Sequence, residues 1–171
     1  MMHPDLQLAN ELIYKKLTLC CDNFVFEPES SDYAAATLTL NHYRILFRIS
    51  KITPTKTGQF VTLWKRSNGG PIQPFDQTDP LDFVIIGIRS QKNVGQFIFP
   101  KAILISKNIF SRNNVGGKRA IRVYAPWDKA NSKQAQITKK WQAEFFVDMS
   151  DGVNNSDIQA DSIITLGGTA A

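Results

Sequence analysis

The sequence predicts an α+β domain, with a mixed, largely antiparallel central sheet of five or six strands flanked by an N-terminal and a C-terminal helix. Apolar residues recur at spacings of three and four near both ends of the chain, whereas the middle contains short apolar or alternating runs between turn residues. With 171 residues, of which 43% are hydrophobic, the chain is long enough for one core. We expect one domain over residues 1–150 and a polar, mobile tail over residues 151–171.

Two long helices and one short helix are predicted. The long helices span Asp5–Leu19 and Ser132–Phe146, with Ser132 as N-cap of the second. The apolar stripes that predict them consist of Leu6, Ala9, Ile13 and Leu17 in the first helix and Ile137, Trp141 and Phe145 in the second. A short helix is expected from Ala102, and the acidic residues 20–31 are expected to form a loose link.

The predicted strands lie between these helices. Residues 34–65 predict a three-stranded antiparallel meander, whose last hairpin turns at residues 53–58 with proline and glycine supplying the backbone angles. The nearly all-apolar run Phe83–Ile88 predicts a strand covered on both faces and paired with Gln96–Phe99. A last strand is expected at Ala120–Ala125.

The charge distribution carries the functional prediction. Fourteen of the twenty basic residues lie in two segments without Asp or Glu, residues 33–75 and 83–127, and the net charge is +5. These segments form most of the predicted sheet, so we expect its surface to be positive. Cationic strands also protect sheet edges from aggregation, but this role does not require that carboxylates be excluded from two whole segments. Phosphate binding explains the exclusion directly, because each nearby acid would weaken the attraction.

Particular residues follow from this pattern. Phosphate contacts are predicted for Lys51, Lys56, Lys65, Arg66, Lys101, Lys118, Arg119 and Arg122. Three polar side chains are expected to orient a nucleic-acid backbone by hydrogen bonds, namely Thr53, Gln59 and Gln96. Two glycines before Lys118 would let backbone N–H groups approach an anion, although a flexible surface loop explains them equally well. The predicted partner is a nucleic acid, in the first place DNA.

A metal-dependent nuclease is the alternative. Nucleases of the restriction-endonuclease type place an Asp on one strand and an acid-x-Lys motif on the next, which suggests Asp79 or Asp82 with Lys101. However, the acid position two residues before Lys101 is Phe99, so that strand offers no oxygen ligand to a divalent cation. The sequence therefore favours a non-catalytic protein without metal or cofactor. A protein-interaction or regulatory module is the third possibility.

Several features bear on location. No apolar run approaches the roughly 20 residues of a membrane helix, and the N-terminus lacks the basic and apolar regions of a secretory signal. Cys20 and Cys21 are adjacent, which is a poor arrangement for an ordinary structural disulfide. We therefore expect a cytoplasmic protein that is not associated with a membrane.

Five segments together resemble the signature of the MepB-like family. They are Phe47–Arg66, Gly95–Lys101, Gly117–Ala120, Val123–Trp127 and the Gln-rich helix through Trp141. The resemblance runs from about Tyr33 to Phe146 with the motifs in register. The family takes its name from a protein encoded in a staphylococcal multidrug-efflux operon. The resemblance implies a small cytoplasmic protein that binds nucleic acid, with a fold compared to restriction endonucleases. It implies no catalytic residues, because the family has no established enzymatic role.

Overall fold

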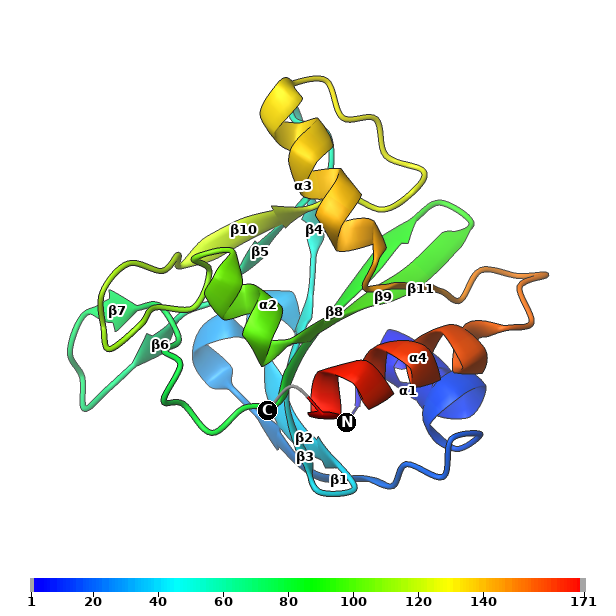
Figure 1. Ribbon diagram of the computed structural model, residues 1–171, viewed down its shortest axis with the longest axis horizontal. Helices are drawn as coiled ribbons and strands as arrows, with labels where there is room; N and C mark the ends of the chain where they lie inside the picture. Colours follow the sequence, from blue (N-terminus) through cyan, green and yellow to red (C-terminus); the bar gives the residue numbers. More distant parts are fainter. Residues whose placement is uncertain (1, 170–171) are drawn as a thin grey trace.

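A six-stranded sheet forms the centre of the computed structural model, which describes residues 2–169 (Figure 1). In spatial order its strands are β1 (Cys21–Phe26), β2 (Ala36–Leu40), β3 (Tyr43–Ile49), β8 (Phe83–Ser90), β9 (Asn93–Pro100) and β11 (Phe146–Asp148). Only the central pair, β3 and β8, is parallel, and the other neighbouring pairs are antiparallel. The predicted α+β class with a mixed, largely antiparallel sheet is confirmed.

The central sheet has an apolar surface on both sides, because successive side chains of a strand point to opposite faces. On β3, Ile45 and Phe47 join one cluster of buried residues and Leu46 joins another. On β8, Ile85 belongs to the first cluster and Ile86 to the second. The protein therefore has two cores, one on each face of the sheet.

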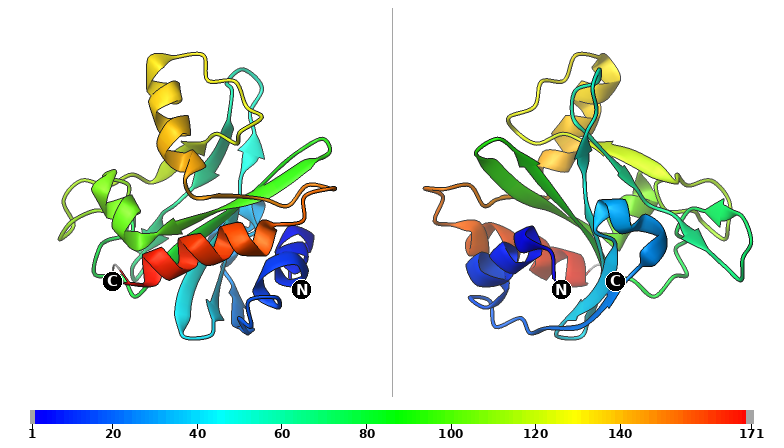
Figure 2. Two further views of the ribbon diagram at one scale, coloured as in Figure 1. Left: turned by 45° about the vertical axis from the view of Figure 1, so that its right-hand side comes forward. Right: turned by 180° about the vertical axis from the view of Figure 1, so that it is seen from behind.

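Helices from the two ends of the chain cover the first face (Figure 2). They are α1 (Pro4–Ala9) with the π-helical turn η1 (Asn10–Tyr14), and α4 (Ser156–Thr169). The first helix thus ends before Leu19, where it was expected to end. The prediction that residues 151–171 form a polar tail is wrong for α4, because Ala160, Ile163 and Ile164 are buried in this core. Residues 170 and 171 of that predicted tail lie outside the described residues.

A second sheet and two further helices cover the other face (Figures 1 and 2). The strands of the second sheet, in spatial order, are β10 (Ala120–Val123), β5 (Gln59–Thr62) and β4 (Lys51–Ile52). The helices are α2 (Lys101–Ser106) and α3 (Lys133–Ala143), and a separate hairpin consists of β6 (Lys65–Arg66) and β7 (Ile72–Gln73). As predicted, Ser132 caps α3, since its side chain accepts a hydrogen bond from the Ala135 N–H at 3.1 Å. Over residues 2–169 there is no helix with the length and apolar character needed to cross a membrane.

The predicted three-stranded meander does not form, because the chain changes sheets at Ser50. The Ser50 N–H donates to the Gly87 carbonyl at 2.9 Å, and its hydroxyl donates to Gln59 Oε1 at 2.8 Å. Beyond this corner β4 and β5 form the expected hairpin, but in the second sheet. In the central sheet β8 takes the place beside β3, a parallel pairing of distant segments that no local pattern indicates.

The acidic residues 20–31, expected to be a loose link, contain a strand and a short helix. They form the edge strand β1 and the start of the 3-10 helix η2 (Pro28–Tyr33). The strand escaped prediction because it does not alternate between buried and exposed positions, and its register against β2 shifts between Asp22 and Val25.

Candidate nucleic-acid interface

A groove opens between α3, β10 and the turn at residues 53–58. Figure 1 shows α3 and β10 in its upper part. It consists of two cavities of about 340 and 410 Å³ that share Arg122, Tyr124, Ser132 and Ala135. We call this combined depression the basic groove, since its lining includes Lys56, Lys107, Lys118 and Arg122. Among the described residues, no Asp or Glu lines either cavity. The groove is therefore a concave surface with positive charge on several sides.

The turn at residues 53–58 forms one end of the groove and is packed tightly on β10. Gly58 has a φ of +72°, and a Cβ atom at this position would lie 2.7 Å from the Tyr124 ring. Any larger residue would push the turn away from the strand. This close packing places the exposed Lys56 at the groove.

Hydrogen bonds join the other walls of the groove to β10. Arg122 donates to the Thr57 carbonyl at 3.1 Å and to the Thr53 hydroxyl. Arg122 and Thr53, which were both predicted to contact nucleic acid, therefore hold the turn in place. On the opposite side, the buried Gln142 of α3 accepts the Tyr124 N–H at 2.8 Å and donates to the Arg122 carbonyl at 2.9 Å. The groove thus keeps its shape through bonds within the protein.

The loop before β10 presents Lys118 and Arg119, and both side chains are exposed. The glycines of this loop serve packing. A Cβ atom at Gly117 would lie 2.8 Å from Pro74, and the Gly117 N–H donates to Asn108 Oδ1 at 3.0 Å. This N–H is therefore already used, and it does not offer the anion contact that the two glycines suggested.

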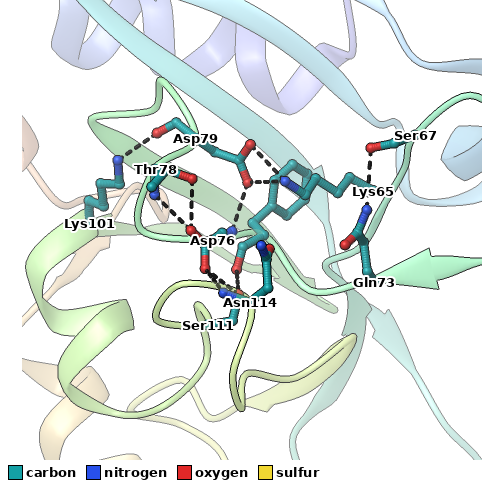
Figure 3. A network of polar contacts seen from close by, with 10 residues as sticks. Lys65, Ser67, Gln73, Asp76, Thr78, Asp79, Lys101, Ser111 and Asn114 are labelled. Atoms are coloured by element: carbon teal, nitrogen blue, oxygen red, sulfur yellow. Dashed lines mark hydrogen bonds and ion pairs between the residues drawn. The ribbon is translucent and has the colours of Figure 1, made fainter.

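Two other lysines of the predicted set lie around a pair of aspartates instead (Figure 3). The Asp79 carboxylate pairs with Lys65 Nζ at 2.7 Å and accepts the Asp76 N–H at 2.7 Å. Lys101 Nζ donates to the Asp79 carbonyl at 2.5 Å. We call this cluster the Asp76–Asp79 network, and its members are Lys65, Asp76, Thr78, Asp79, Lys101, Ser111 and Asn114.

The buried carboxylate of Asp76 connects two segments of the chain. It accepts hydrogen bonds from the Asn114 N–H at 2.8 Å, the Ser111 hydroxyl at 2.7 Å and the Thr78 hydroxyl at 2.7 Å. These bonds, first that from Asn114, hold the pKa of Asp76 well below its ordinary value. The charged Asp76 side chain therefore holds the loop before β10 against the segment after β7 by hydrogen bonds.

Arg66 and Lys51 also have acidic partners. Arg66 Nε lies 2.9 Å from a Glu29 oxygen. Lys51 Nζ lies 3.8 Å from an Asp32 oxygen and 4.7 Å from the centroid of the Tyr33 ring. These acids come from η2, the segment that the sequence did not predict to be structured. Both cations are thus partly neutralised at the surface, and neither lines the basic groove.

Gln59 and Gln96 lie inside the protein, with exposed fractions of 2% and 1%. Gln59 accepts from the Ser50 hydroxyl and donates to the Arg89 carbonyl at 2.9 Å, while Gln96 accepts from the Tyr14 hydroxyl at 2.9 Å. Their burial does not fit the prediction that they contact a nucleic-acid backbone. Both glutamines follow a glycine, but Gly58 directly precedes β5, whereas Gly95 lies within β9.

The residues considered for a nuclease have structural partners. In addition to the bonds of Asp79 and Lys101, Asp82 Oδ2 accepts the Arg44 N–H at 2.7 Å, which joins β3 to the start of β8. Phe99, at the position of the missing acid, packs against Trp141 with ring centroids 5.4 Å apart. Over residues 2–169 no three His, Cys, Asp or Glu side chains gather in a way that could hold a metal ion.

Sequence reasoning did not select Lys107, although it lies in an acid-free segment. Lys107 follows α2 directly, and its Nζ lies 5.6 Å from the centroid of the Trp141 ring on α3. Its position in a segment without Asp or Glu could have identified Lys107 as a candidate. However, only the packing of α2 beside α3 brings it to the groove that Lys118 and Arg122 also line.

Two comparisons with known proteins identify the same family. The sequence model of the MepB-like family matches residues 27–148, well over half of the chain. Among solved structures, the crystal structure of MepB is similar with a TM-score of 0.73 and 30% sequence identity, and the alignment covers 86% of this chain and 97% of that chain. No curated protein matches this chain. The chain belongs to the MepB-like family, as its sequence motifs predicted.

Proposed function

We propose that this protein is a non-catalytic DNA-binding protein whose basic groove contacts phosphate groups. The observation that carries the proposal is the gathering of Lys56, Lys107, Lys118 and Arg122 around one concave surface that no described carboxylate lines. Arg119, the residue after Lys118, is also exposed. Cations without nearby acids attract polyanions and release condensed counterions when phosphates replace them.

The non-catalytic part of the proposal is supported by the bonds of the acidic residues. Asp79 is held by Lys65 and by a backbone N–H, and Asp82 is held by the backbone of β3. A nuclease would need such carboxylates as free metal ligands. We therefore expect DNA incubated with Mg²⁺ or Mn²⁺ to remain intact. Cleavage that is abolished by Asp82→Ala would overturn this part of the proposal.

A cytoplasmic location, where DNA is accessible, belongs to the same proposal. Cys20 and Cys21 are both free thiols, and Cys20 is exposed. Free exposed thiols are typical of reducing compartments.

The test of DNA binding is a fluorescence anisotropy titration at several salt concentrations. We expect the affinity for any DNA sequence to fall steeply as salt rises from about 50 to about 300 mM, since phosphate contacts are salt-dependent. The double variant Lys118→Glu with Arg119→Glu should bind at least about tenfold more weakly, with a shallower salt dependence.

The matched control is Lys16→Glu with Lys92→Glu. Both lysines are exposed, neither lines the basic groove, and the pair changes the net charge by the same amount. We expect this control to keep most of the affinity. An affinity that does not depend on salt, or an equal loss in both double variants, would contradict the proposed groove.

A further inference from the structure

We propose that the protein binds a free α-amino acid with a large apolar side chain in a depression between α2 and α4. This depression consists of two cavities of about 370 and 470 Å³, and both are lined by Ala102 and Gly167. We call it the α2–α4 depression. None of its lining residues also lines the basic groove. The proposed ligand site is therefore separate from the proposed DNA-binding surface.

The smaller cavity is lined by an acid and a base that are neighbours in the fold but do not form an ion pair. The Lys101 backbone N–H donates to the Asp82 carbonyl at 3.0 Å, so the two side chains start from adjacent positions. Among the ion pairs of residues 2–169, none joins Lys101 to Asp82. An acid and a base that do not neutralise each other can bind the two opposite charges of a zwitterion.

Backbone groups of other segments hold both charged side chains in place. Lys101 Nζ donates to the Asp79 carbonyl (Figure 3), and Asp82 Oδ2 accepts the Arg44 N–H at 2.7 Å. Each side chain keeps unused capacity for hydrogen bonds, since an ammonium group has three donors and a carboxylate has two acceptor oxygens. A ligand therefore meets charged groups whose orientation is already fixed, which lowers the entropic cost of binding.

Tyr43 adds a hydroxyl group to the smaller cavity. This hydroxyl forms no hydrogen bond within the described part of the chain, and a Cβ atom at Gly168 would lie 2.6 Å from it. Any residue larger than glycine at position 168 would therefore cover the hydroxyl. His42, whose ring centroid lies 4.2 Å from that of Tyr43, lines the same cavity. The Tyr43 hydroxyl can donate to a ligand carboxylate that also pairs with Lys101.

The larger cavity forms the apolar half of the depression. Its lining includes Pro100, Ile103, Phe145 and Ile163, and its one charged residue among those described, Glu144, is exposed. The volume of about 470 Å³ lies within the roughly 300–1,000 Å³ range of small-molecule pockets. An aliphatic or aromatic side chain that enters this cavity removes apolar surface of both partners from water.

The combination of two opposite charges with an apolar cavity selects an amino acid over ligands with one charge. A fatty acid would bring its carboxylate close to Asp82, and an alkylammonium ion would bring its charge close to Lys101, so each would meet repulsion. In an α-amino acid the ammonium group, the carboxylate and the side chain all leave the same carbon atom. The side chain can then pass over the small residues Ala102 and Gly167 into the larger cavity.

The experiment is isothermal titration calorimetry of the full chain with L-phenylalanine and L-leucine. We expect dissociation constants on the order of 100 µM, as for other ligands of this size. Three analogues serve as controls: N-acetyl-L-phenylalanine lacks the ammonium charge, L-phenylalanine amide lacks the carboxylate, and L-alanine lacks the large side chain. Each should bind at least roughly tenfold more weakly than L-phenylalanine, since each loses one charged hydrogen bond or the apolar contact.

The decisive variant is Asp82→Asn, which removes the charge but keeps an oxygen that can accept the Arg44 N–H. We expect it to lose at least roughly tenfold in affinity for L-phenylalanine and to bind N-acetyl-L-phenylalanine no more weakly than the native protein does. A merely structural role of Asp82 would weaken both ligands equally. Asp161→Asn is the matched control, because Asp161 is exposed on α4 and lines neither cavity.

A second variant, Ala102→Gln, keeps the test decisive if Asp82→Asn does not fold. Ala102 is exposed on α2, and glutamine is a good helix former, so we expect this variant to fold. Its longer side chain fills the junction of the two cavities and should weaken binding of L-phenylalanine at least roughly tenfold.

Three outcomes would overturn the amino-acid site: no binding of L-phenylalanine or L-leucine at about 10 mM, equal affinity for L-phenylalanine and its two charge-modified analogues, or native affinity in both variants. None of these outcomes bears on the basic groove. DNA affinity should be unchanged in Asp82→Asn and Ala102→Gln, since neither residue lines that groove.

Discussion

The basic groove and the Asp76–Asp79 network contain lysines from the same kind of sequence context, yet their electrostatic surroundings differ. Among residues 2–169, no carboxylate lies within ion-pair distance of Lys56, Lys107 or Lys118. In the network, Lys65 pairs with the Asp79 carboxylate, and Lys101 donates to the Asp79 carbonyl. The first group is available to a ligand, whereas the second holds the fold together.

The origin of the acids explains this difference. The two acid-free segments, residues 33–75 and 83–127, are separated by a short connection that carries Asp76, Asp79 and Asp82. In the folded chain this connection lies against both segments and reaches the lysines on either side of it (Figure 3). An acid-free segment of sequence is therefore not an acid-free surface. Of the predicted cations that this connection does not reach, Lys51 and Arg66 pair with acids of η2, whereas Lys56 and Lys118 have no described carboxylate within ion-pair distance.

The largest effect is expected for Asp76→Ala, which separates stability from binding. The substitution leaves the Asn114 N–H and the hydroxyls of Ser111 and Thr78 without their acceptor. We expect the melting temperature to fall by roughly 10 °C, as for other broken buried networks. Asp161→Ala on the exposed side of α4 is the control and should change it by no more than about 2 °C.

The same variant should keep its DNA affinity at a temperature where it is folded, within about twofold. If Asp76→Ala lost affinity as strongly as the Lys118→Glu and Arg119→Glu double variant, the network would belong to the binding surface, and the comparison between the two regions would fail.

Acid unfolding is the second prediction. The pKa of Asp76 is lowered in the folded protein, so this group stabilises the fold fully above its unfolded pKa of about 4 and loses that contribution as the pH falls towards the folded value. We expect the urea midpoint of the native protein to decrease steeply between pH 5 and pH 2. Asp76→Asn should be less stable at pH 7 but show a smaller decrease, because it has no carboxyl group to protonate. Parallel pH profiles of the two proteins would contradict this assignment.

A third prediction uses the salt dependence of DNA binding to distinguish paired from unpaired lysines. Lys107→Gln should weaken binding a few-fold and reduce the slope of log affinity against log salt by roughly 0.7 to 0.9, the value of one phosphate contact. Lys65→Gln should leave the slope unchanged, because Lys65 is occupied by Asp79. Equal slopes for the two variants would show that ion pairing within the protein does not decide which lysines bind DNA.

Local periodicity was sufficient to predict the elements whose pattern lies within the element itself. The hairpin of β8 and β9 and the helix α3 with its Ser132 cap follow from apolar runs and capping chemistry. In contrast, the parallel pairing of β3 with β8 depends on contacts between distant segments. The helix α4 was missed because the composition of its segment, rich in Asp, Asn and Ser, was taken to indicate a tail, although Ala160, Ile163 and Ile164 recur at helical spacing.

For the candidate site too, the sequence predicted residues with a local pattern but not contacts between distant segments. Lys56 and Lys118 were identifiable because their segments contain no acid and because turn residues place them at the surface. The pairing of Lys65 with Asp79 could not be predicted, since it forms between a strand and a connection 14 residues away.

The smallest effect is expected for Glu29→Gln, which tests where the binding surface ends. Arg66 pairs with Glu29 at 2.9 Å, but the two side chains are 35% and 55% exposed, and exposed pairs contribute less than about 1 kcal/mol to stability. The substitution frees Arg66 from its acid without placing it in the basic groove. We therefore expect DNA affinity within about twofold of the native value, measured by anisotropy at low salt. An increase of several-fold would mean that a released Arg66 reaches DNA, and the binding surface would then extend from the groove to the hairpin of β6 and β7.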